Sequence, residues 1–473
     1  MRMLIAGEWT DGAVREDVTN PFNGDVIDTV PVASRADVDR ALAAAVGAAD
    51  RQRHTPAYDR QAILLRAADL ADERVDELAR TISLESGKLL TEATGEASRA
   101  GDMLRLAAFE GAQLYGDSLP LDAHRGAGQG RLGFTLRQPC GVVVAITPFN
   151  YPSLLVLHKI APALAAGNAV ILKPARKTPL TALKLTEILL DAGLDPEAIS
   201  CVTGPGADIG AQLCSDSRVR KISFTGNSAT GQAITRVAGV KRLSLELGAS
   251  CPVIVLPDAD IELAARAVSI GGYVNAGQVC ISVQRVLVDR TVMPDFLDAL
   301  TPLVEAIRTG DPLDPQTTVG VLVSDVEARR VERAIHASAA SGSRVLCGGE
   351  REGTMLRPAV VADVDPASPF SREELFGPAV AVSPASGIDD AIRLANDSPY
   401  GLGAGVFTRD VTSALRFARE VDAGMVHINW TPLWRADLMP YGGLKNSGIG
   451  KEGARSAVEE MTEAKTIILH GAS

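Results

Sequence analysis

Three side chains stand out in the sequence because their chemical types could cooperate in catalysis. Cys280 follows Tyr-Val-Asn-Ala-Gly-Gln-Val, Glu246 lies in the otherwise apolar Leu-Glu-Leu-Gly, and Asn150 lies in the proline-bounded turn Ile-Thr-Pro-Phe-Asn-Tyr-Pro. A thiol, a carboxylate and an amide can serve as nucleophile, general base and oxyanion donor. Taken alone, each residue also has an ordinary explanation, as a buried thiol, a solvent-facing strand residue and a turn residue.

Together the three groups would suit the oxidation of an aldehyde. A thiol that attacks the carbonyl produces a tetrahedral oxyanion, which the Asn150 amide and the Cys280 backbone N–H could stabilise; losing one such donor typically costs ~10²–10³ in rate. Collapse of this species expels hydride, which requires a nicotinamide ring next to the carbon. The resulting thioester needs an activated water. Apolar surroundings should raise the pKa of the Glu246 carboxyl group and suit it as the general base.

Predicted strands alternate with predicted helices around Asn150. Continuously apolar, β-branched runs such as Val-Val-Val-Ala-Ile at 142–146 are typical of central parallel strands. Because this alternation produces a parallel sheet covered by helices on both faces, the sequence predicts an α/β fold with ligands at the carboxyl ends of the strands. The predicted strands are 142–146, 169–174, 199–203 and 221–224, and the predicted helices are 153–166, 179–193, 207–216 and 229–238. The residues of interest at or just after the strand ends are Asn150, Lys173, Gly204 and Gly226.

After Glu246 the alternation restarts, which predicts a second α/β domain. Residues 252–256 and 281–288 have strand patterns, and 259–275 has a helical pattern. The alternation continues to about residue 440. The segment 460–469 has a strand pattern without a nearby partner in the sequence, so another subunit is a candidate partner for it.

Composition limits the classes of function. A chain of 473 residues is too long for one core, so we expect two or three domains. The net charge of −11 argues against binding to nucleic acid or to an anionic membrane, since both require basic surface. No apolar run reaches the ~18 residues of a membrane helix, and we see no signal peptide.

The six cysteines are scattered and include no Cys-x-x-Cys pair. That spacing fits neither a zinc site nor a disulfide framework, so we expect no metal. It fits a reducing compartment, and we expect the protein to be cytoplasmic.

Several blocks, in their order and spacing, resemble the aldehyde dehydrogenase superfamily over nearly the whole chain. They are Thr-Pro-Phe-Asn-Tyr-Pro (147–152), Leu-Lys-Pro-Ala (172–175), Phe-Thr-Gly-Asn-Ser-Ala-Thr-Gly (224–231), Leu-Glu-Leu-Gly (245–248), Gly-Gln-Val-Cys (277–280), Glu-Glu-Leu-Phe-Gly-Pro (373–378) and Pro-Tyr-Gly-Gly-Leu-Lys-Asn-Ser-Gly (440–448). The resemblance implies a Rossmann-like cofactor domain (1–119 and 139–246), an α/β catalytic domain (247–445) and a β oligomerisation arm (120–138 and 460–473). It also implies a homodimer or homotetramer.

The resemblance implies specific roles as well. Cys280 would be the nucleophile, Glu246 the general base and Asn150 part of the oxyanion hole. The residues expected at the cofactor are Thr147, Phe149, Lys173, Arg176, Gly204, Gly226, Asn227, Glu374 and Phe376.

The chain departs from the family pattern at the cofactor ribose. NAD-preferring members often have Glu three residues after the lysine that corresponds to Lys173, where it holds the ribose 2′-hydroxyl. Here that residue is Arg176, followed by Lys177. A carboxylate would repel a 2′-phosphate, whereas an arginine could pair with it. We therefore expect NADP as cofactor, with NAD also usable; the alternative is that both cations are only solvated charges at a helix start.

Three segments resemble the lactaldehyde and phosphonoacetaldehyde dehydrogenase-like branch: 149–159, 277–285 and 434–443. Substrates in that branch are short and polar or anionic. Arg105, His158 and Arg435 could hold a carboxylate, phosphonate or sulfonate. We expect a small anionic aldehyde of the phosphonoaldehyde or semialdehyde type. The alternatives are a lactaldehyde or broad short-chain aldehyde dehydrogenase and a succinate-semialdehyde dehydrogenase.

Two competing functions are weaker. A CoA-acylating enzyme would tend to lack the general base, and Glu246 is present. A non-catalytic protein of the same fold would be expected to lose its nucleophile, and Cys280 is present. The predicted activity is therefore non-acylating aldehyde oxidation.

Overall fold

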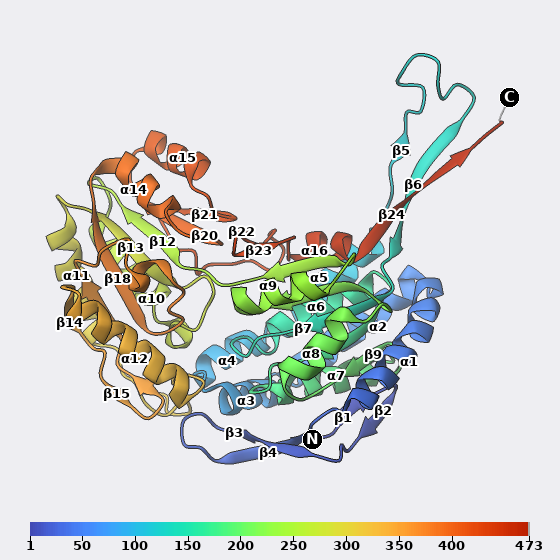
Figure 1. Ribbon diagram of the computed structural model, residues 1–473, viewed down its shortest axis with the longest axis horizontal. Helices are drawn as coiled ribbons and strands as arrows, with labels where there is room; N and C mark the ends of the chain where they lie inside the picture. Colours follow the sequence, from blue (N-terminus) through green and yellow to red (C-terminus); the bar gives the residue numbers. More distant parts are fainter. Residues whose placement is uncertain (472–473) are drawn as a thin grey trace.

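The computed structural model describes residues 1–471, so the last two residues of the predicted arm segment 460–473 lie outside the described part. Two large sheets dominate the fold, and a narrow β arm projects away from them (Figure 1). Parallel strands flanked by helices confirm the predicted α/β class. The sequence halves separate in space, with the blue-to-green half around one sheet and the yellow-to-orange half around the other (Figure 1).

The first sheet has eight strands in the order β2-β1-β9-β8-β7-β10-β11-β23. Its five central strands run parallel, and their apolar, β-branched residues are almost completely buried. The strands are β1 (Met3–Ile5), β2 (Glu8–Thr10), β7 (Val142–Ile146), β8 (Ala169–Lys173), β9 (Ile199–Cys201), β10 (Val219–Thr225), β11 (Arg242–Glu246) and β23 (Gly448–Ile449).

Amphipathic helices surround this sheet, as the helical spacing of apolar residues predicts. Their buried faces join the strands in one large core. The helices are α1 (Arg35–His54), α2 (Ala57–Glu73), α3 (Val75–Ser86), α4 (Leu90–Ala97), α5 (Ala100–Ala112), α6 (Leu154–Ala165), α7 (Pro179–Asp191), α8 (Gly206–Ser215), α9 (Ser228–Val237) and α16 (Ala454–Glu460).

The second sheet has seven strands in the order β14-β17-β18-β13-β12-β20-β21. Its strands are β12 (Cys251–Val255), β13 (Val283–Asp289), β14 (Arg344–Cys347), β17 (Ala359–Ala362), β18 (Ala379–Ala385), β20 (Gly403–Phe407) and β21 (Met425–Ile428). Its helices are α10 (Ile261–Gly271), α11 (Met293–Glu305), α12 (Asp325–Ala340), α13 (Pro369–Arg372), α14 (Gly387–Asn396) and α15 (Val411–Glu420). The predicted helix 259–275 ends earlier, at Gly271, and a 3₁₀ turn (Val274–Gly277) follows it.

The arm is a three-stranded sheet of β5 (Ser118–Leu119), β6 (Leu132–Pro139) and β24 (Thr462–Leu469). The C-terminal strand β24 pairs antiparallel with β6 along its whole length, from Thr462 opposite Pro139 to Leu469 opposite Leu132. Its partner therefore lies in the same chain, in a segment distant in sequence. Figure 1 shows this ribbon standing clear of both sheets.

Three small pairs complete the strands. The hairpin of β3 (Arg15–Thr19) and β4 (Val26–Pro31) lies at the periphery, near α3 (Figure 1). The others pair β15 (Arg351–Glu352) with β16 (Met355–Leu356) and β19 (Tyr400–Gly401) with β22 (Leu444–Lys445). No helix among residues 1–471 is long and apolar enough to cross a membrane.

Candidate active site

The chain turns sharply before Cys280. Asn275 (φ 52°), Ala276 (φ 53°) and Gly277 (φ 70°) all have backbone angles in the left-handed region, which residues other than glycine rarely adopt. A Cβ on Gly277 would lie 2.2 Å from the carbonyl oxygen of Gly377, so glycine is required at this position. Cys280 follows this strained turn, three residues before β13 begins, and lines two cavities.

Asn150, in the loop after β7, and Glu92, on helix α4, hold this turn. The Asn150 Nδ2 group donates to the carbonyl of Gln278 at 2.8 Å, and the Asn275 amide donates to the carbonyl of Asn150 at 3.3 Å. Glu92 accepts from the Asn275 backbone N–H at 3.1 Å. An amide nitrogen has two hydrogens, so the Asn150 side chain retains one that could be donated to a ligand while the other holds the segment before Cys280.

Cys280 Sγ lies 2.9 Å from the hydroxyl of Tyr441. Burial raises the pKa of the Cys280 thiol to about 12, although the Tyr441 hydrogen bond opposes this shift. The thiol is therefore protonated at neutral pH and would have to lose its proton to act as a nucleophile. Sequence reasoning missed Tyr441, which lies in the Pro-Tyr-Gly-Gly block without a pattern of its own.

Glu246 ends strand β11 and is buried. Neither of its carboxylate oxygens has a hydrogen-bond partner within residues 1–471. Burial and the nearby Glu452 charge raise its pKa well above the ordinary value, against the opposing charges of Lys159 and Arg435. A carboxyl group that is poorly solvated and free of partners is suited to take a proton from water.

Buried ion pairs lie beside Glu246. Lys159 donates to Glu452 at 2.8 Å, and Arg435 lies 3.4 Å from the same carboxylate. Burial favours the neutral acid, but the two cations outweigh it and lower the pKa of Glu452 to about 2. The pKa values of the two neighbouring carboxyl groups are therefore shifted in opposite directions, that of Glu452 downward by its cations and that of Glu246 upward by burial.

A small cavity of about 100 Å³ lies on one side of Cys280. Two of the predicted substrate residues, His158 and Arg435, line it. The full lining is Arg99, Tyr151, Leu154, Leu155, His158, Val279, Cys280, Ile281, Leu433, Arg435 and Tyr441.

Arg435 is the central cation of this cavity. Its guanidinium group stacks 3.8 Å from the centre of the Tyr441 ring, and its Nη2 lies 3.4 Å from His158 Nδ1. Its Nε has no hydrogen-bond partner among the described residues. A buried guanidinium with an unpaired N–H is suited to an anionic ligand.

The prediction that Arg105 contributes to this cavity is wrong. Arg105 lies on the outer face of α5 and pairs with Asp69 and Asp72 at 2.8 and 2.6 Å. Arg99, at the start of α5, lines the cavity instead and donates to both oxygens of Asp437. The sequence could not distinguish the two arginines, because the start of α5 rather than its middle faces the cavity.

A larger cavity of about 630 Å³ lies on the other side of Cys280. Six of the nine predicted cofactor residues line it: Thr147, Phe149, Gly226, Asn227, Glu374 and Phe376. The N-terminus of α9 faces this region, and Asn227 caps it by accepting from the Thr230 N–H at 2.8 Å. Helix N-termini favour phosphate groups, so this end of the cavity is suited to a pyrophosphate.

Glu374 and Phe376 define the end of this cavity near Cys280. Burial raises the pKa of Glu374 to about 7, and its carboxylate accepts from the Ala249 N–H at 3.0 Å. Phe376 packs edge-on against Phe149, with 5.9 Å between ring centres. Two aromatic rings therefore form part of the wall of the cavity that also contains Cys280.

The remaining predicted cofactor residues lie at or just after the carboxyl ends of strands β8 and β9 in the first sheet. Burial lowers the pKa of Lys173, at the end of β8, to about 8. Gly204 follows β9 with φ 131°, and a Cβ there would lie 2.8 Å from Ile209. Arg176 is 62% exposed and donates from Nε to Glu16 at 2.6 Å. The alternative hypothesis, that Arg176 is only a solvated charge at a helix start, leaves out this ion pair with Glu16.

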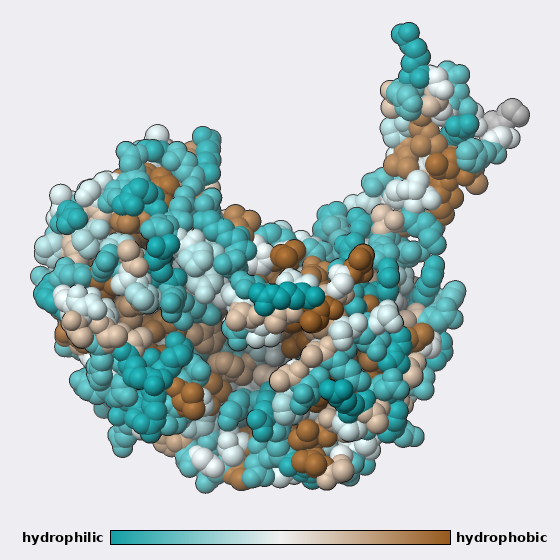
Figure 2. Space-filling model, in the orientation of Figure 1, coloured by the Kyte–Doolittle hydropathy of each residue, from teal (hydrophilic) through white to brown (hydrophobic). Residues whose placement is uncertain are grey.

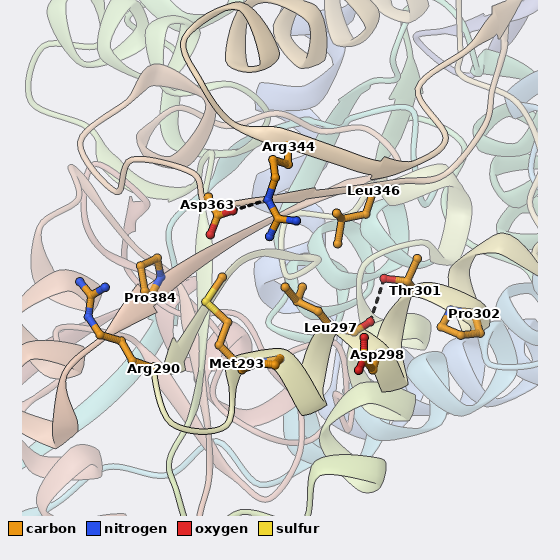
Figure 3. A pocket seen from close by; sticks show the side chains of 11 residues that line it. Arg290, Met293, Leu297, Asp298, Thr301, Pro302, Arg344, Leu346, Asp363 and Pro384 are labelled. Atoms are coloured by element: carbon orange, nitrogen blue, oxygen red, sulfur yellow. Dashed lines mark hydrogen bonds and ion pairs between the residues drawn. The ribbon is translucent and has the colours of Figure 1, made fainter.

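The cavity of about 690 Å³ in Figure 3 lies elsewhere, against α11 and β14. It contains none of the predicted site residues, and its Arg344 pairs with Asp363 at 2.5 Å. The described residues contain no cluster of metal-binding side chains. The two smaller cavities contain most of the predicted site residues, and Cys280 lines both of them.

Comparison with known proteins agrees with this geometry. Residues 9–467 match the model of the aldehyde dehydrogenase family, and the chain belongs to that family. The 3-sulfolactaldehyde dehydrogenase of Priestia aryabhattai is 41% identical over 468 residues, covering 99% of this chain and 98% of the relative. The lactaldehyde dehydrogenase of Methanococcus vannielii is 36% identical over 474 residues, covering 99% and 100%.

A solved structure extends the similarity to three dimensions. The NADP-dependent glyceraldehyde-3-phosphate dehydrogenase from Bacillus halodurans C-125, complexed with NADP, has a TM-score of 0.97 and 34% identity. The similarity covers 99% of this chain and 98% of that chain. The predictions of an aldehyde dehydrogenase fold and of an enzyme of that family are confirmed.

Proposed function

We propose that this protein is a non-acylating aldehyde dehydrogenase that uses NADP, and also accepts NAD, to oxidise a small anionic aldehyde to the carboxylic acid. The observation that carries the substrate class is Arg435, a buried cation with an unpaired N–H in a cavity of about 100 Å³ beside Cys280. The cavity volume favours a short substrate, and the cation favours an anionic one.

Cys280 and Asn150 would perform the first step. Cys280 Sγ attacks the aldehyde carbon as the thiol proton passes to water, and the electron pair of the C=O π bond moves onto the carbonyl oxygen. The developing oxyanion receives hydrogen bonds from the free Asn150 Nδ2 hydrogen and from the Cys280 backbone N–H. The left-handed turn at 275–277 and the Asn150–Gln278 hydrogen bond keep these donors in place before substrate binds.

The larger cavity fits a nicotinamide dinucleotide. The capped N-terminus of α9 is suited to its pyrophosphate. A Cβ on Gly226 would lie 2.5 Å from Cζ of Phe224, so the glycine lets the Phe224 ring pack directly against the backbone here. When bound there, the nicotinamide would accept the hydride from the substrate carbon. Phe149 and Phe376 would exclude water from the ring, and Glu374 would orient the adjoining ribose through its carboxylate.

Glu246 would then serve the thioester step. Its unpartnered carboxylate takes a proton from a water that attacks the thioester at Cys280. The raised pKa of Glu246 makes it a stronger base than an exposed carboxylate. Hydrolysis releases the carboxylic acid and restores the Cys280 thiol.

The identity of the anionic group rests on the cavity and on the relatives. A sulfonate, phosphonate or carboxylate could each pair with Arg435, and the relative from Priestia aryabhattai is named for a sulfonated aldehyde. We propose a sulfonated or phosphonated short aldehyde, with succinate semialdehyde as another candidate. The alternative, a lactaldehyde or broad short-chain aldehyde dehydrogenase, is favoured by the relative from Methanococcus vannielii.

An Arg435→Ala variant tests the substrate class. We expect kcat/KM for an anionic aldehyde to fall ~10–100-fold relative to propanal, because a charge-assisted hydrogen bond contributes ~1.5–3 kcal/mol. Comparing one anionic and one neutral aldehyde cancels general damage to the site. Arg105→Ala is the matched control, since Arg105 is a nearby cation outside the cavity. An unchanged ratio in Arg435→Ala would favour the broad short-chain alternative.

We also propose that the arm forms a homodimer or homotetramer. The arm exposes apolar side chains, visible as brown atoms on the projecting ribbon in Figure 2. They are Leu132, Leu136, Ile468 and Leu469, each at least 43% exposed. Such a patch favours a protein partner. Light scattering of the protein and of a Leu136→Asp variant would test this, and a monomeric parent protein would contradict it.

A cytoplasmic location completes the proposal. Its support is the set of free cysteines among the described residues, which is typical of a reducing compartment. Fractionation of the producing cells, with an antibody to this protein, would test the location. Recovery of the protein outside the cytoplasmic fraction would contradict it.

A further inference from the structure

A carboxylate that the sequence did not indicate lies beside Arg176. Glu16, on strand β3, accepts from Arg176 through Oε2. Its side chain is only 13% exposed, although Arg176 is 62% exposed. The second oxygen, Oε1, is buried and has no hydrogen-bond partner within residues 1–471. A buried carboxylate oxygen without a donor is costly, so this oxygen is suited to a ligand that brings one.

The β3–β4 hairpin brings Glu16 to the carboxyl ends of the strands of the first sheet, near the end of β9. Glu16 pairs with Val30 on β4, and the end of that strand binds the segment after β9: the Thr203 hydroxyl donates to Pro31, and Ala33 donates to the Thr203 carbonyl at 2.9 Å. The charge of Glu16 acts on Lys173, where it opposes the effect of burial on the lysine pKa. Glu16 therefore lies at the carboxyl ends of these strands, near Lys173, where the adenine ribose is expected.

The two members of the pair favour different dinucleotides. A carboxylate accepts a hydrogen bond from a free ribose 2′-hydroxyl, and its charge repels a 2′-phosphate. An arginine attracts a 2′-phosphate. Glu16 and Arg176 therefore act in opposite directions on the same position of the cofactor.

We propose that Glu16 is a cofactor-specificity residue, which accepts from the adenine ribose of NAD through Oε1 and weakens binding of NADP by repelling its 2′-phosphate. This inference rests on the proposed function, which assigns a dinucleotide to this edge. Arg176 alone would give a strong preference for NADP. With Glu16 present, the chain binds both dinucleotides.

Equilibrium binding of NAD and NADP tests the inference without any aldehyde. Isothermal titration calorimetry gives both Kd values for the parent protein and for Glu16→Gln, which keeps the shape and removes the charge. We expect the ratio Kd(NAD)/Kd(NADP) to rise by at least about tenfold, equivalent to ~1.4 kcal/mol. Asp17→Asn is the control, because Asp17 is an exposed carboxylate at the next position of the same strand.

Whether the ratio Kd(NAD)/Kd(NADP) rises or falls in Glu16→Gln distinguishes this role from a purely structural one. If Glu16 only oriented Arg176 for the phosphate, its loss would weaken NADP binding and the ratio would fall. A falling or unchanged ratio overturns the inference. The Arg176→Ala background adds a second criterion: the Glu16→Gln change must still weaken NAD binding there, since the hydroxyl contact is direct. Loss of that effect would mean that Glu16 acts only through Arg176, and would also overturn the inference.

The same titrations separate this inference from the proposed function. If the parent protein binds neither dinucleotide, the proposed cofactor and the role of Glu16 both fail. If the parent protein binds them and Glu16→Gln leaves the ratio unchanged, only the role of Glu16 fails.

Discussion

Replacing Glu246 by glutamine should separate the two halves of the reaction. The carboxylate is 4% exposed, and neither oxygen has a partner among the described residues, so the substitution removes a base without breaking an ion pair. Glutamine has nearly the same shape. The nearby Lys159–Glu452 pair and the Asn150 donor remain, so attack by Cys280 should continue.

The expected magnitude follows from the role of a general base. Such a group contributes ~10²–10⁴ in rate, so the steady-state rate of Glu246→Gln should fall by that factor. That loss corresponds to ~2.7–5.5 kcal/mol in the barrier for thioester hydrolysis. The first turnover should survive, with a burst of about one NADPH per subunit, because an acylated enzyme accumulates.

Stopped-flow absorbance measures the burst, and mass spectrometry of acid-quenched enzyme detects the acyl group on Cys280. The pH profile provides a second test. Because the pKa of Glu246 is raised, the parent rate should increase with pH as this group loses its proton, and the variant profile should lose that increase. Glu459→Gln is the control, because Glu459 is a partly exposed carboxylate on α16 that pairs with Arg455.

Two results would refute this reasoning. Absence of both the burst and the acyl adduct would mean that Glu246 acts before the thioester forms. A steady-state rate close to that of the parent protein would mean that another group activates the water.

Three further predictions follow from buried contacts. Asn150→Ala should lower kcat ~10²–10³-fold through loss of an oxyanion donor and leave the Kd for NADP within about twofold; a changed Kd with an unchanged kcat would contradict this. Glu96→Gln breaks the fully buried pair with Lys88 and should cost ~3–5 kcal/mol, seen as a lower thermal midpoint, whereas an unchanged midpoint would show that the pair is dispensable. Burial and Arg435 lower the pKa of His158 in the folded protein, so as the pH falls the unfolded protein protonates this histidine before the folded protein does. The free energy of unfolding should therefore decrease as the pH drops below about 6.5. His158→Gln should flatten that dependence of the thermal midpoint, and an identical slope in the variant would assign the dependence to other groups.

The local sequence was enough to predict the class and much of the architecture. Apolar, β-branched runs such as 142–146 and 169–173 become buried parallel strands because β-branched residues favour the extended conformation and a strand covered on both faces has apolar side chains at every position. The block around Cys280 and the aldehyde dehydrogenase resemblance were also evident. Family membership is confirmed by the match over residues 9–467.

Helix orientation and the pairing of distant strands required the tertiary structure. Arg99 and Arg105 have the same charge and lie on the same helical segment, yet only Arg99 reaches the cavity, because the packing of α5 decides which residues face inward. Likewise, β24 has a strand pattern, but nothing local identifies β6 as its partner.

The sequence and the tertiary structure differ most in what they show about the side chains that surround the three candidate catalytic residues and the cofactor position. The sequence by itself determined the nucleophile, the base and the amide as candidates, since each belongs to a distinctive local block. Only the tertiary structure decided that Tyr441 contacts the thiol, that Arg435 points to the cavity and that Glu16 pairs with Arg176. The physical reason is that pKa shifts, ion pairs and unpaired polar atoms depend on distances between residues far apart in the chain, and burial sets their strength.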